Sequence, residues 1–167
     1  MISVGERIPS VAVRRVTAET SEDIDSADFL GTGRVAFFTV PGAFTPTCHN
    51  RHLPGYVEHA DELFAAGIEK IVCGAVNDHN VMQAWGIQSG AFPKLEFLAD
   101  AHARLASAMG LAKEFAELGQ RFVRSSLLIN QGVVQSITLE TASGPALATG
   151  ADAFLETIRT HQFAETA

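Results

Sequence analysis

The sequence predicts an α/β fold in which a mixed β-sheet carries helices on both faces. Two short, continuous apolar runs, residues 35–40 and 71–76, have the length and composition of strands that are buried on both sides. Each run is followed by an amphipathic stretch with helical spacing, the order of elements that produces parallel strands. Later, two apolar segments flank Asn130-Gln131-Gly132, where the glycine suits the tight turn of an antiparallel hairpin. Parallel strands joined to a hairpin make a mixed sheet.

Composition favours a single globular domain spanning residues 1–167. Hydrophobic residues make up 47% of the chain and charged residues 19%, which is enough apolar material for a buried core. The formal net charge of −7 disfavours a nucleic-acid partner, which would require a basic surface. No apolar stretch reaches the roughly 20 residues that cross a membrane, so no membrane association is expected. Two cysteines are too few for a disulfide framework, and the first residues lack the apolar core of a signal peptide, so we expect a cytoplasmic protein.

The residues before the first buried strand give weaker signals. Residues 3–16 alternate loosely around Pro9, which predicts an extended arm or an edge hairpin. Residues 21–33 are polar and acidic and end in Gly31-Thr32-Gly33, which predicts a turn region on the surface.

A long amphipathic helix is expected after Cys48. Its apolar side is formed by residues at helical spacing: Leu53, Val57, Ala60, Leu63 and Phe64. Pro54 and Gly55 interrupt the helix, so we expect a kink there. The helix should end near Gly67, because glycine fits the left-handed residue that closes many helices.

The second half of the chain continues the alternation of strands and helices. Asn77-Asp78 predicts the N-cap of a helix that carries Val81, Met82 and Trp85. The remaining elements are expected in this order: a loop at 86–93, a strand at 95–98, short helical segments at 105–109 and 112–118, strands at 123–129 and 133–139, a loop at 141–150, and a closing helix at 151–161.

The segment Pro41-Gly42-Ala43-Phe44-Thr45-Pro46-Thr47-Cys48 joins the first buried strand to the long helix. Thr45 is a favourable N-cap residue, and Pro46 suits the first helical position because its missing N–H is not needed there. Cys48 therefore belongs to the first helical turn, beside unpaired N–H groups and the positive end of the helix dipole. A thiol in such a position ionises more readily than a free one, and the thiolate is the reactive form. This arrangement makes Cys48 a candidate nucleophile.

These residues resemble the peroxiredoxins, and more narrowly the peroxiredoxin-5 type, a family with a thioredoxin-like fold. The resemblance covers nearly the whole chain. It is carried by Pro41, Thr45, Cys48, the run from His52 to Tyr56, Val76-Asn77-Asp78, Phe97-Leu98-Ala99-Asp100 and Arg124.

The resemblance implies a thiol peroxidase that reduces hydrogen peroxide and organic hydroperoxides without a metal or an organic cofactor. Cys48 would attack the O–O bond and become a sulfenic acid. Thr45 would hydrogen-bond the thiolate and the peroxide, Pro41 would shield the pocket, and Arg124 would hold the thiolate and position the peroxide. Members of this family dimerise through the active-site edge, so the resemblance also implies a homodimer.

The source of the reducing electrons is only partly indicated. Some members of the family carry a resolving cysteine in the loop before the last helix, but residues 141–150 contain no cysteine. The resemblance therefore implies a one-cysteine enzyme that is recycled by an external thiol, either glutathione with glutaredoxin or thioredoxin. Cys73 lies inside an apolar run, where we expect a buried and inert thiol. The choice between these reductants and the preferred peroxide stay open at this point.

Ionisation of the thiol alone does not account for a fast peroxidase. A thiol with a pKa of about 6 instead of about 8.5 gains roughly 30-fold in thiolate at neutral pH. Its nucleophilicity falls by roughly 10- to 20-fold over the same change, so the net gain is only about 2- to 3-fold. The larger contribution is expected from donors that stabilise charge on the departing oxygen, which is the role implied for Arg124, Thr45 and backbone N–H groups.

The same residues also permit less specific interpretations. Cys48 could be an ordinary buried thiol, because free cysteine packs as a small apolar residue. Thr45 could act only as an N-cap, and Arg124 could form an ion pair at the surface. The protein could also sense peroxide and pass the oxidation to a partner without turnover. Peroxide consumption with a thiol reductant distinguishes an enzyme from such a sensor.

A metal-binding module is the third possibility. His49, His52 and His59 lie close to Cys48 in the sequence, and Cys48 and His52 have the i,i+4 spacing of one helix face. However, the chain has no Cys-x-x-Cys or His-x-x-x-His pair, which a zinc site of ordinary spacing would contain. We therefore expect no metal ligand among these residues.

Overall fold

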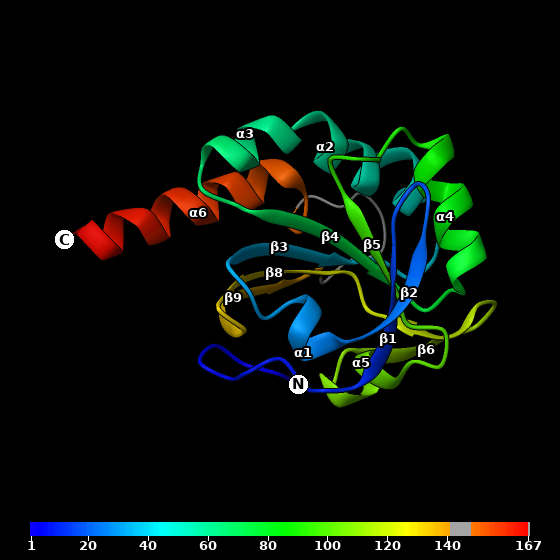
Figure 1. The fold of residues 1–167 in the computed structure, drawn as a ribbon. Coiled ribbons are helices and arrows are strands. Elements are labelled where there is room, and N and C mark those ends of the chain that lie inside the picture. Colours follow the sequence, from blue (N-terminus) through cyan, green and yellow to red (C-terminus); the bar gives the residue numbers. More distant parts are fainter. Residues whose placement is uncertain (141–147, 167) are drawn as a thin grey trace.

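The computed structural model describes residues 1–140 and 148–166, which are arranged around one seven-stranded sheet (Figure 1). The strand order is β2-β1-β5-β4-β3-β8-β9, and a separate sheet pairs β6 with β7. The strands are β1 (Ala12–Val16), β2 (Ser21–Asp25), β3 (Arg34–Thr39), β4 (Lys70–Ala75), β5 (Glu96–Ala99), β6 (Ala112–Phe115), β7 (Gly119–Phe122), β8 (Ser125–Asn130) and β9 (Val133–Leu139). The helices are α1 (Ser26–Phe29), the π-helix η1 (Cys48–His52), α2 (Leu53–Glu58), α3 (Ala60–Ala65), α4 (His79–Gln88), α5 (Arg104–Ala108) and α6 (Ala151–Thr166).

The centre of the large sheet is parallel and its two sides are antiparallel. β3, β4 and β5 run in the same direction, as expected for strands that are joined by helical crossovers. β8 pairs antiparallel with β3, and β9 pairs antiparallel with β8. On the other side, β1 pairs antiparallel with β5, and β2 pairs antiparallel with β1. The mixed sheet predicted from the sequence is therefore confirmed.

Each face of the sheet has its own hydrophobic core, because successive side chains of a strand point to opposite faces. Phe38 and Cys73 belong to the core on the face covered by α2, α3, α4 and α6 (Figure 1). Phe37 and Val72 belong to the core on the opposite face, where α1 and α5 lie. All four residues are fully buried. This two-sided burial explains why β3 and β4 are continuous apolar runs in the sequence.

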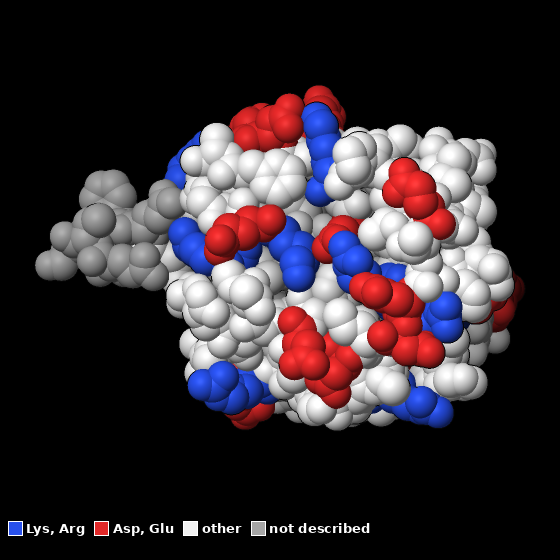
Figure 2. All heavy atoms as spheres, in the orientation of Figure 1, with Lys and Arg blue, Asp and Glu red and all other residues white. Residues whose placement is uncertain are grey.

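Residues 21–33 do not form the predicted surface turn region, because they contain strand β2 and helix α1. The acidic residues that suggested a turn form ion pairs across the hairpin, Asp23 with Arg14 and Glu22 with Arg15. Cross-strand pairs of opposite charge stabilise an edge strand that lacks apolar alternation. Figure 2 shows acidic and basic side chains intermixed on the face that carries this hairpin.

The predicted helical segment at 112–118 is a β-hairpin instead. β6 and β7 pair antiparallel, and Gly119 at the turn has a positive φ of 78°. The local sequence has high helix propensity, but Phe122 at the end of β7 is fully buried beside Phe37, with their ring centroids 6.4 Å apart. Burial of this aromatic ring outweighs the local preference for a helix.

The helix after the first strand consists of three segments, with a π-helix directly before the predicted position of the kink and a further break at His59. The chain is helical from Pro46 and passes through η1 into α2 and α3, which are separated at His59. Pro54 directly follows the π-helix η1, so the helix is irregular on the N-terminal side of the proline. The predicted end of the helix is confirmed, because Gly67 has a φ of 102°.

Helix α4 begins as predicted and ends later than predicted. The Asp78 carboxylate accepts hydrogen bonds from the N–H groups of Asn80 and Val81 at 2.8 and 3.1 Å, which is the expected N-cap. The helix then continues to Gln88, so the first residues of the predicted loop at 86–93 are helical.

The last predicted hairpin is confirmed. Gln131 and Gly132 connect β8 to β9 with φ values of 51° and 80°, the conformation of the tightest hairpin turns. The loop predicted at 141–150 lies largely outside the described residues. The described helices include none that is long and apolar enough to span a bilayer.

Two glycines in helices provide a matched test of this packing. A Cβ atom added at Gly86 of α4 would lie 2.3 Å from the Phe92 ring and 2.6 Å from the Phe97 ring. A Cβ atom added at Gly55 of α2 would have no neighbour within 4 Å. The same substitution is therefore expected to have opposite effects at the two positions.

We expect Gly86→Ala to destabilise the protein by about 1–3 kcal/mol, because overpacking outweighs the gain of about 1 kcal/mol in helix propensity. Gly55→Ala brings only the propensity gain and should stabilise the protein by up to about 1 kcal/mol. Urea unfolding of both variants measures these changes. A Gly86→Ala variant more stable than the parent would contradict the contact between α4 and the aromatic rings.

Candidate active site

Cys48 lies at the start of the helical region that follows β3, as predicted. The chain is helical from Pro46, and the Thr45 carbonyl accepts the first hydrogen bond, from the His49 N–H at 2.8 Å. Cys48 itself has no exposed surface, and it packs in the core beside apolar residues such as Val40 and Leu53. The candidate nucleophile is therefore a free, buried thiol in the first helical turn.

Side-chain hydrogen bonds hold the turn before the helix, but the predicted hydrogen bond from a helix N–H to the Thr45 hydroxyl is not among them. The Thr45 hydroxyl donates to the Gly42 carbonyl at 2.7 Å, so its hydrogen is not directed at the Cys48 sulfur, and no helix N–H donates to this hydroxyl. The Asn77 side chain accepts a hydrogen bond from the Ala43 N–H at 2.9 Å and so ties the turn to the end of β4. Thr45 therefore stands at the predicted N-cap position, directly before Pro46, but its hydroxyl closes the turn instead of capping the helix.

Arg124 contacts the thiol from the bend that directly precedes strand β8. Thr39 at the end of β3 pairs with Ser125 at the start of β8, so Arg124 lies beside the segment that follows β3. Its Nη2 donates to Cys48 Sγ at 3.1 Å, and its Nη1 lies 2.9 Å from His52 Nδ1. Arg124 forms no ion pair with any residue in the described part of the chain. Its position excludes the surface ion pair that the sequence also permitted.

His52 is buried and neutral, and its contacts define which ring nitrogen carries the proton. Nε2 lies 3.0 Å from the carbonyl oxygen of Thr149, which can only accept, so Nε2 is the protonated nitrogen. Nδ1 is then the acceptor for Arg124. Burial, followed by the nearby charge of Arg124, lowers the pKa of His52 to about 3. At neutral pH the ring therefore accepts from Arg124 without adding a second positive charge.

Glu140 connects the two ends of this hydrogen-bond chain. Its N–H donates to the Arg124 carbonyl at 3.0 Å, and its carboxylate accepts from the N–H and the hydroxyl of Thr149 at 3.1 and 2.9 Å. The Thr149 carbonyl also accepts from the Tyr56 hydroxyl at 2.8 Å. Neither Glu140 nor Thr149 carries a local sequence signal, and we did not predict them. For His52, the i,i+4 spacing from Cys48 was the available signal.

Pro41 is buried at the start of the turn, as expected for a residue that shields the pocket. Its carbonyl accepts a hydrogen bond from Nη1 of Arg121 at 3.4 Å, and Nε of the same arginine donates to the Leu118 carbonyl at 2.9 Å. A Cβ atom at Gly42 would lie 3.1 Å from Arg121 Nη1, so the glycine permits this close approach. Arg121, on β7, is a second arginine at the turn that the sequence analysis missed.

The second cysteine lies in the same core but has different surroundings. Cys73 is fully buried on β4, opposite Phe38 of β3, and is free. Burial, and secondarily the proximity of Cys48, raises the pKa of the Cys73 thiol well above its usual value. The expected buried thiol is confirmed.

The other two histidines near the site have separate partners. His49 Nδ1 accepts a hydrogen bond from Trp85 Nε1 at 3.0 Å. His59 lies at the surface between Glu62 and Asp152, at 2.8 and 3.2 Å. Within the described residues, no three metal-binding side chains come together.

Comparison with known proteins agrees with this geometry. The Redoxin family model matches residues 3–154. A peroxiredoxin of Synechocystis is 35% identical, and the alignment covers 83% of this chain and 79% of that protein. Reduced Prx3 of Vibrio vulnificus in complex with hydrogen peroxide has a similar structure, with a TM-score of 0.90, 33% identity, and 97% and 99% of the two chains covered. Peroxiredoxin 5 of Alvinella pompejana gives a TM-score of 0.83, 30% identity and 96% and 99% coverage.

These similarities extend over nearly the whole chain, so they apply to the complete arrangement of sheet and helices. They confirm the thioredoxin-like α/β fold, with its mixed central sheet flanked by helices. The chain belongs to the redoxin family as a peroxiredoxin of the peroxiredoxin-5 type, and it is a thiol-dependent peroxidase.

Proposed function

We propose that Cys48 supplies the reactive thiolate and that Arg124, Thr45 and Pro41 complete its site. The observation that carries this proposal is the distance of 3.1 Å between Arg124 Nη2 and Cys48 Sγ in a site without solvent exposure at the sulfur. A guanidinium at that distance stabilises negative charge on sulfur, and burial strengthens the interaction because little water screens it.

The chemical step follows from the two groups. The Cys48 thiolate attacks one oxygen of the hydroperoxide, so an S–O bond forms while the O–O bond breaks. The electron pair of the O–O bond leaves on the second oxygen, which takes up the proton that the thiol released and becomes an alcohol or water. The sulfur is oxidised by two electrons to a sulfenic acid, and the peroxide is reduced by the same two. Arg124 stabilises the charge that develops on the leaving oxygen.

Thr45 and Pro41 have supporting roles in this proposal. The Thr45 hydroxyl gives its hydrogen to the Gly42 carbonyl, so its oxygen is left to accept a hydrogen bond. We assign this acceptor to the O–H of the peroxide rather than to the thiolate. Pro41 is buried and has no N–H that would require a partner, so it can cover the sulfur without adding an unpaired donor.

His52 is proposed to be a positioning residue. It holds one nitrogen of the Arg124 guanidinium, so the other nitrogen is directed at Cys48 Sγ. Its neutral state is essential to this role, because a protonated ring would donate from both nitrogens and repel Arg124. The Thr149 carbonyl fixes the tautomer, as a second partner of a functional histidine commonly does.

The sulfenic acid is proposed to be reduced by an external thiol. A first thiol condenses with it to give a mixed disulfide and water, and a second thiol then releases the reduced Cys48. Glutathione with glutaredoxin, or thioredoxin, supplies such thiols. Cys73 is a poor internal reductant, because it is fully buried and its raised pKa leaves little thiolate.

We further propose a homodimer and a cytoplasmic location. Phe44 supports the dimer, because this aromatic residue of the cysteine turn is 42% exposed and packs on His49 and Trp85 with ring centroids 5.5 and 6.3 Å away. Exposed aromatic residues are characteristic of protein interfaces. The cytoplasmic location is supported by the mechanism, since the enzyme requires a compartment in which thiol reductants are maintained.

Cys48→Ser should abolish thiol-dependent consumption of hydrogen peroxide, whereas Cys73→Ser should retain the parent rate. The reason is that only Cys48 has a guanidinium beside its sulfur. Peroxide consumption is measured with glutathione and glutaredoxin, and separately with thioredoxin. Mass spectrometry after one equivalent of peroxide should find the oxidation on Cys48. Turnover by Cys48→Ser, or an internal Cys48–Cys73 disulfide in the parent, would contradict the mechanism.

His52→Leu should lower the peroxidase rate by about tenfold, because Arg124 loses the acceptor that orients it. His52→Gln should retain more activity, since an amide can accept from Arg124 and donate to Thr149. Initial rates of the reduced proteins with hydrogen peroxide provide the measurement. Equal losses in the two variants would show that the ring acts by packing alone.

The free energy of unfolding should also depend on pH through His52. The unfolded chain takes up the His52 proton near pH 6.5, whereas the folded protein does so only near pH 3. This contribution is therefore complete above pH 6.5 and is lost as the pH falls towards 3, by about 1.4 kcal/mol per pH unit within that window. Urea unfolding of His52→Gln at several pH values should show a correspondingly flatter decline than the parent. Parallel pH profiles would contradict the neutral, buried state of His52.

Phe44→Asp should convert the dimer into a monomer, because the substitution places a charge in the proposed contact. Val4→Asp is the matched control, since Val4 is also an exposed apolar residue, at 62%, but lies outside the cysteine turn. Sedimentation velocity of the reduced proteins distinguishes the two states. A monomeric parent, or a Phe44→Asp variant that remains dimeric, would contradict this interface.

A further inference from the structure

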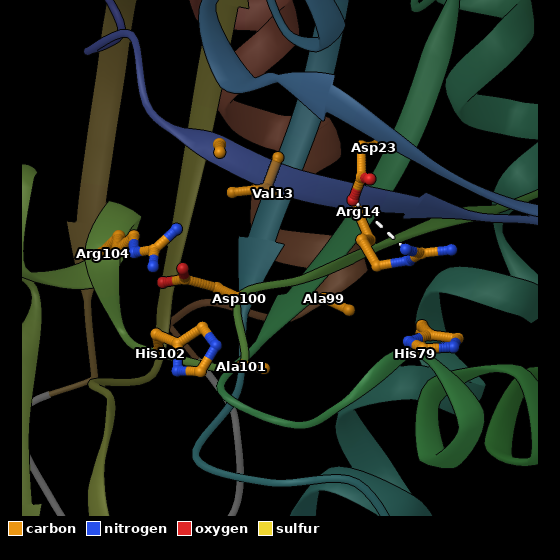
Figure 3. Close-up of a pocket in the computed structure, with 10 residues that line it drawn as sticks. Val13, Arg14, Asp23, His79, Ala99, Asp100, Ala101, His102 and Arg104 are labelled. Atoms are coloured by element: carbon orange, nitrogen blue, oxygen red, sulfur yellow. Dashed lines mark hydrogen bonds and ion pairs between the residues drawn. The ribbon is translucent and has the colours of Figure 1, made fainter.

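Arginines and carboxylates that face each other across the β1–β2 hairpin form ion pairs. Arg14 is opposite Asp23 and Arg15 is opposite Glu22 in the antiparallel register. Their side chains meet at 3.2 and 3.0 Å. Figure 3, a close-up of the cavity beside this hairpin, shows the contact between Arg14 and Asp23 as a dashed line. In this sheet, opposite charges at facing positions therefore do pair.

Arg124 and Glu140 have the same relation across β8 and β9, but their side chains do not pair. Ser125 is opposite Leu139, and the Glu140 N–H donates to the Arg124 carbonyl at 3.0 Å, which continues the pairing by one residue. Facing residues have Cβ atoms only about 4.5–5.5 Å apart, so an ion pair would be expected here. Among the ion pairs of residues 1–140 and 148–166, however, none includes Arg124 or Glu140.

Each of the two side chains is held by other partners. The Arg124 guanidinium donates to Cys48 Sγ and His52 Nδ1. Oε2 of Glu140 accepts from the N–H and the hydroxyl of the fully buried Thr149 at 3.1 and 2.9 Å, and Oε1 accepts from the Ala148 N–H at 3.4 Å. These hydrogen bonds hold the carboxylate on residues 148–149 instead of on the guanidinium.

An ion pair between Glu140 and Arg124 would disturb the proposed chemistry in two ways. A carboxylate forms strong hydrogen bonds with a guanidinium, often with two nitrogens at once, so it would compete with Cys48 Sγ for the donors of Arg124. It would also bring a negative charge close to the sulfur, and a like charge disfavours the thiolate. Arg124 is useful to the thiolate only while this nearby carboxylate is kept away from it.

We propose that Thr149 is a positioning residue for the peroxidase reaction, because it withholds the Glu140 carboxylate from Arg124. This inference rests on the proposed roles of Cys48 and Arg124. Thr149 acts on both sides of the arginine: its N–H and hydroxyl hold Glu140, and its carbonyl holds the His52 ring that accepts from Arg124. The guanidinium is thereby left with an uncharged partner and the sulfur.

Thr149→Val should lower the peroxidase rate by about tenfold, because the loss of the hydroxyl releases Glu140 towards Arg124. The pH profile of the rate should also move to higher pH. The main-chain carbonyl that holds His52 and Tyr56 stays in place in this variant. Glu140→Gln should stay within about twofold of the parent, because one amide oxygen can accept both hydrogen bonds from Thr149.

The decisive measurement is the rate of the double variant Thr149→Val/Glu140→Gln, which should regain the rate of Glu140→Gln because no carboxylate is left to compete. Thr149→Val/Glu19→Gln is the matched control: it removes the same charge at the exposed β1–β2 turn and should stay as slow as Thr149→Val. A crystal structure of Thr149→Val should show Glu140 on Arg124.

A double variant as slow as Thr149→Val, or a Thr149→Val variant with the parent's rate and pH profile, would overturn the inference. Turnover that survives Cys48→Ser would instead remove the proposed function on which the inference rests.

Discussion

The proposed active site depends on a contact between two groups that lie 76 positions apart in the chain, Nη2 of Arg124 and Sγ of Cys48. A guanidinium has several donors and a long side chain, so proximity alone does not direct one particular nitrogen at the sulfur. The orientation of the guanidinium comes from uncharged partners. His52 Nδ1 accepts from Arg124 Nη1, and the Thr149 carbonyl holds the opposite nitrogen of the His52 ring. The site thus contains one positive charge beside the sulfur, and hydrogen bonds orient it.

The sheet brings these groups together. β3 ends at the cysteine turn and β8 begins directly after Arg124, and the antiparallel register places Thr39 opposite Ser125. The register is determined by burial on both faces, because a shift by one residue would exchange the side chains of the two cores. The packing of residues such as Phe37 and Phe38 therefore also determines the position of Arg124.

The two cysteines are equally buried but have different neighbours. Both are fully buried in the same core, on neighbouring elements. Cys48 has the Arg124 guanidinium within hydrogen-bond distance, whereas the pKa of Cys73 is raised because burial dominates its environment. Two thiols of the same burial thus have different surroundings, because one is at a helix start with a cationic donor and the other is in the middle of a strand.

Local patterns in the sequence determined the elements around the site. The apolar runs of β3 and β4, the Asp78 cap and the Gly132 turn depend on neighbours in the chain, and Cys48 was placed in the first helical turn for the same reason. Resemblance to the peroxiredoxins added Arg124, which no local pattern would have selected. The tertiary structure alone decided that residues 112–118 form a hairpin, that the Thr45 hydroxyl closes the turn, and that His52, Thr149 and Glu140 orient the arginine. These features depend on side chains that meet across strands and helices, and the energy of such contacts is absent from any short stretch of the sequence.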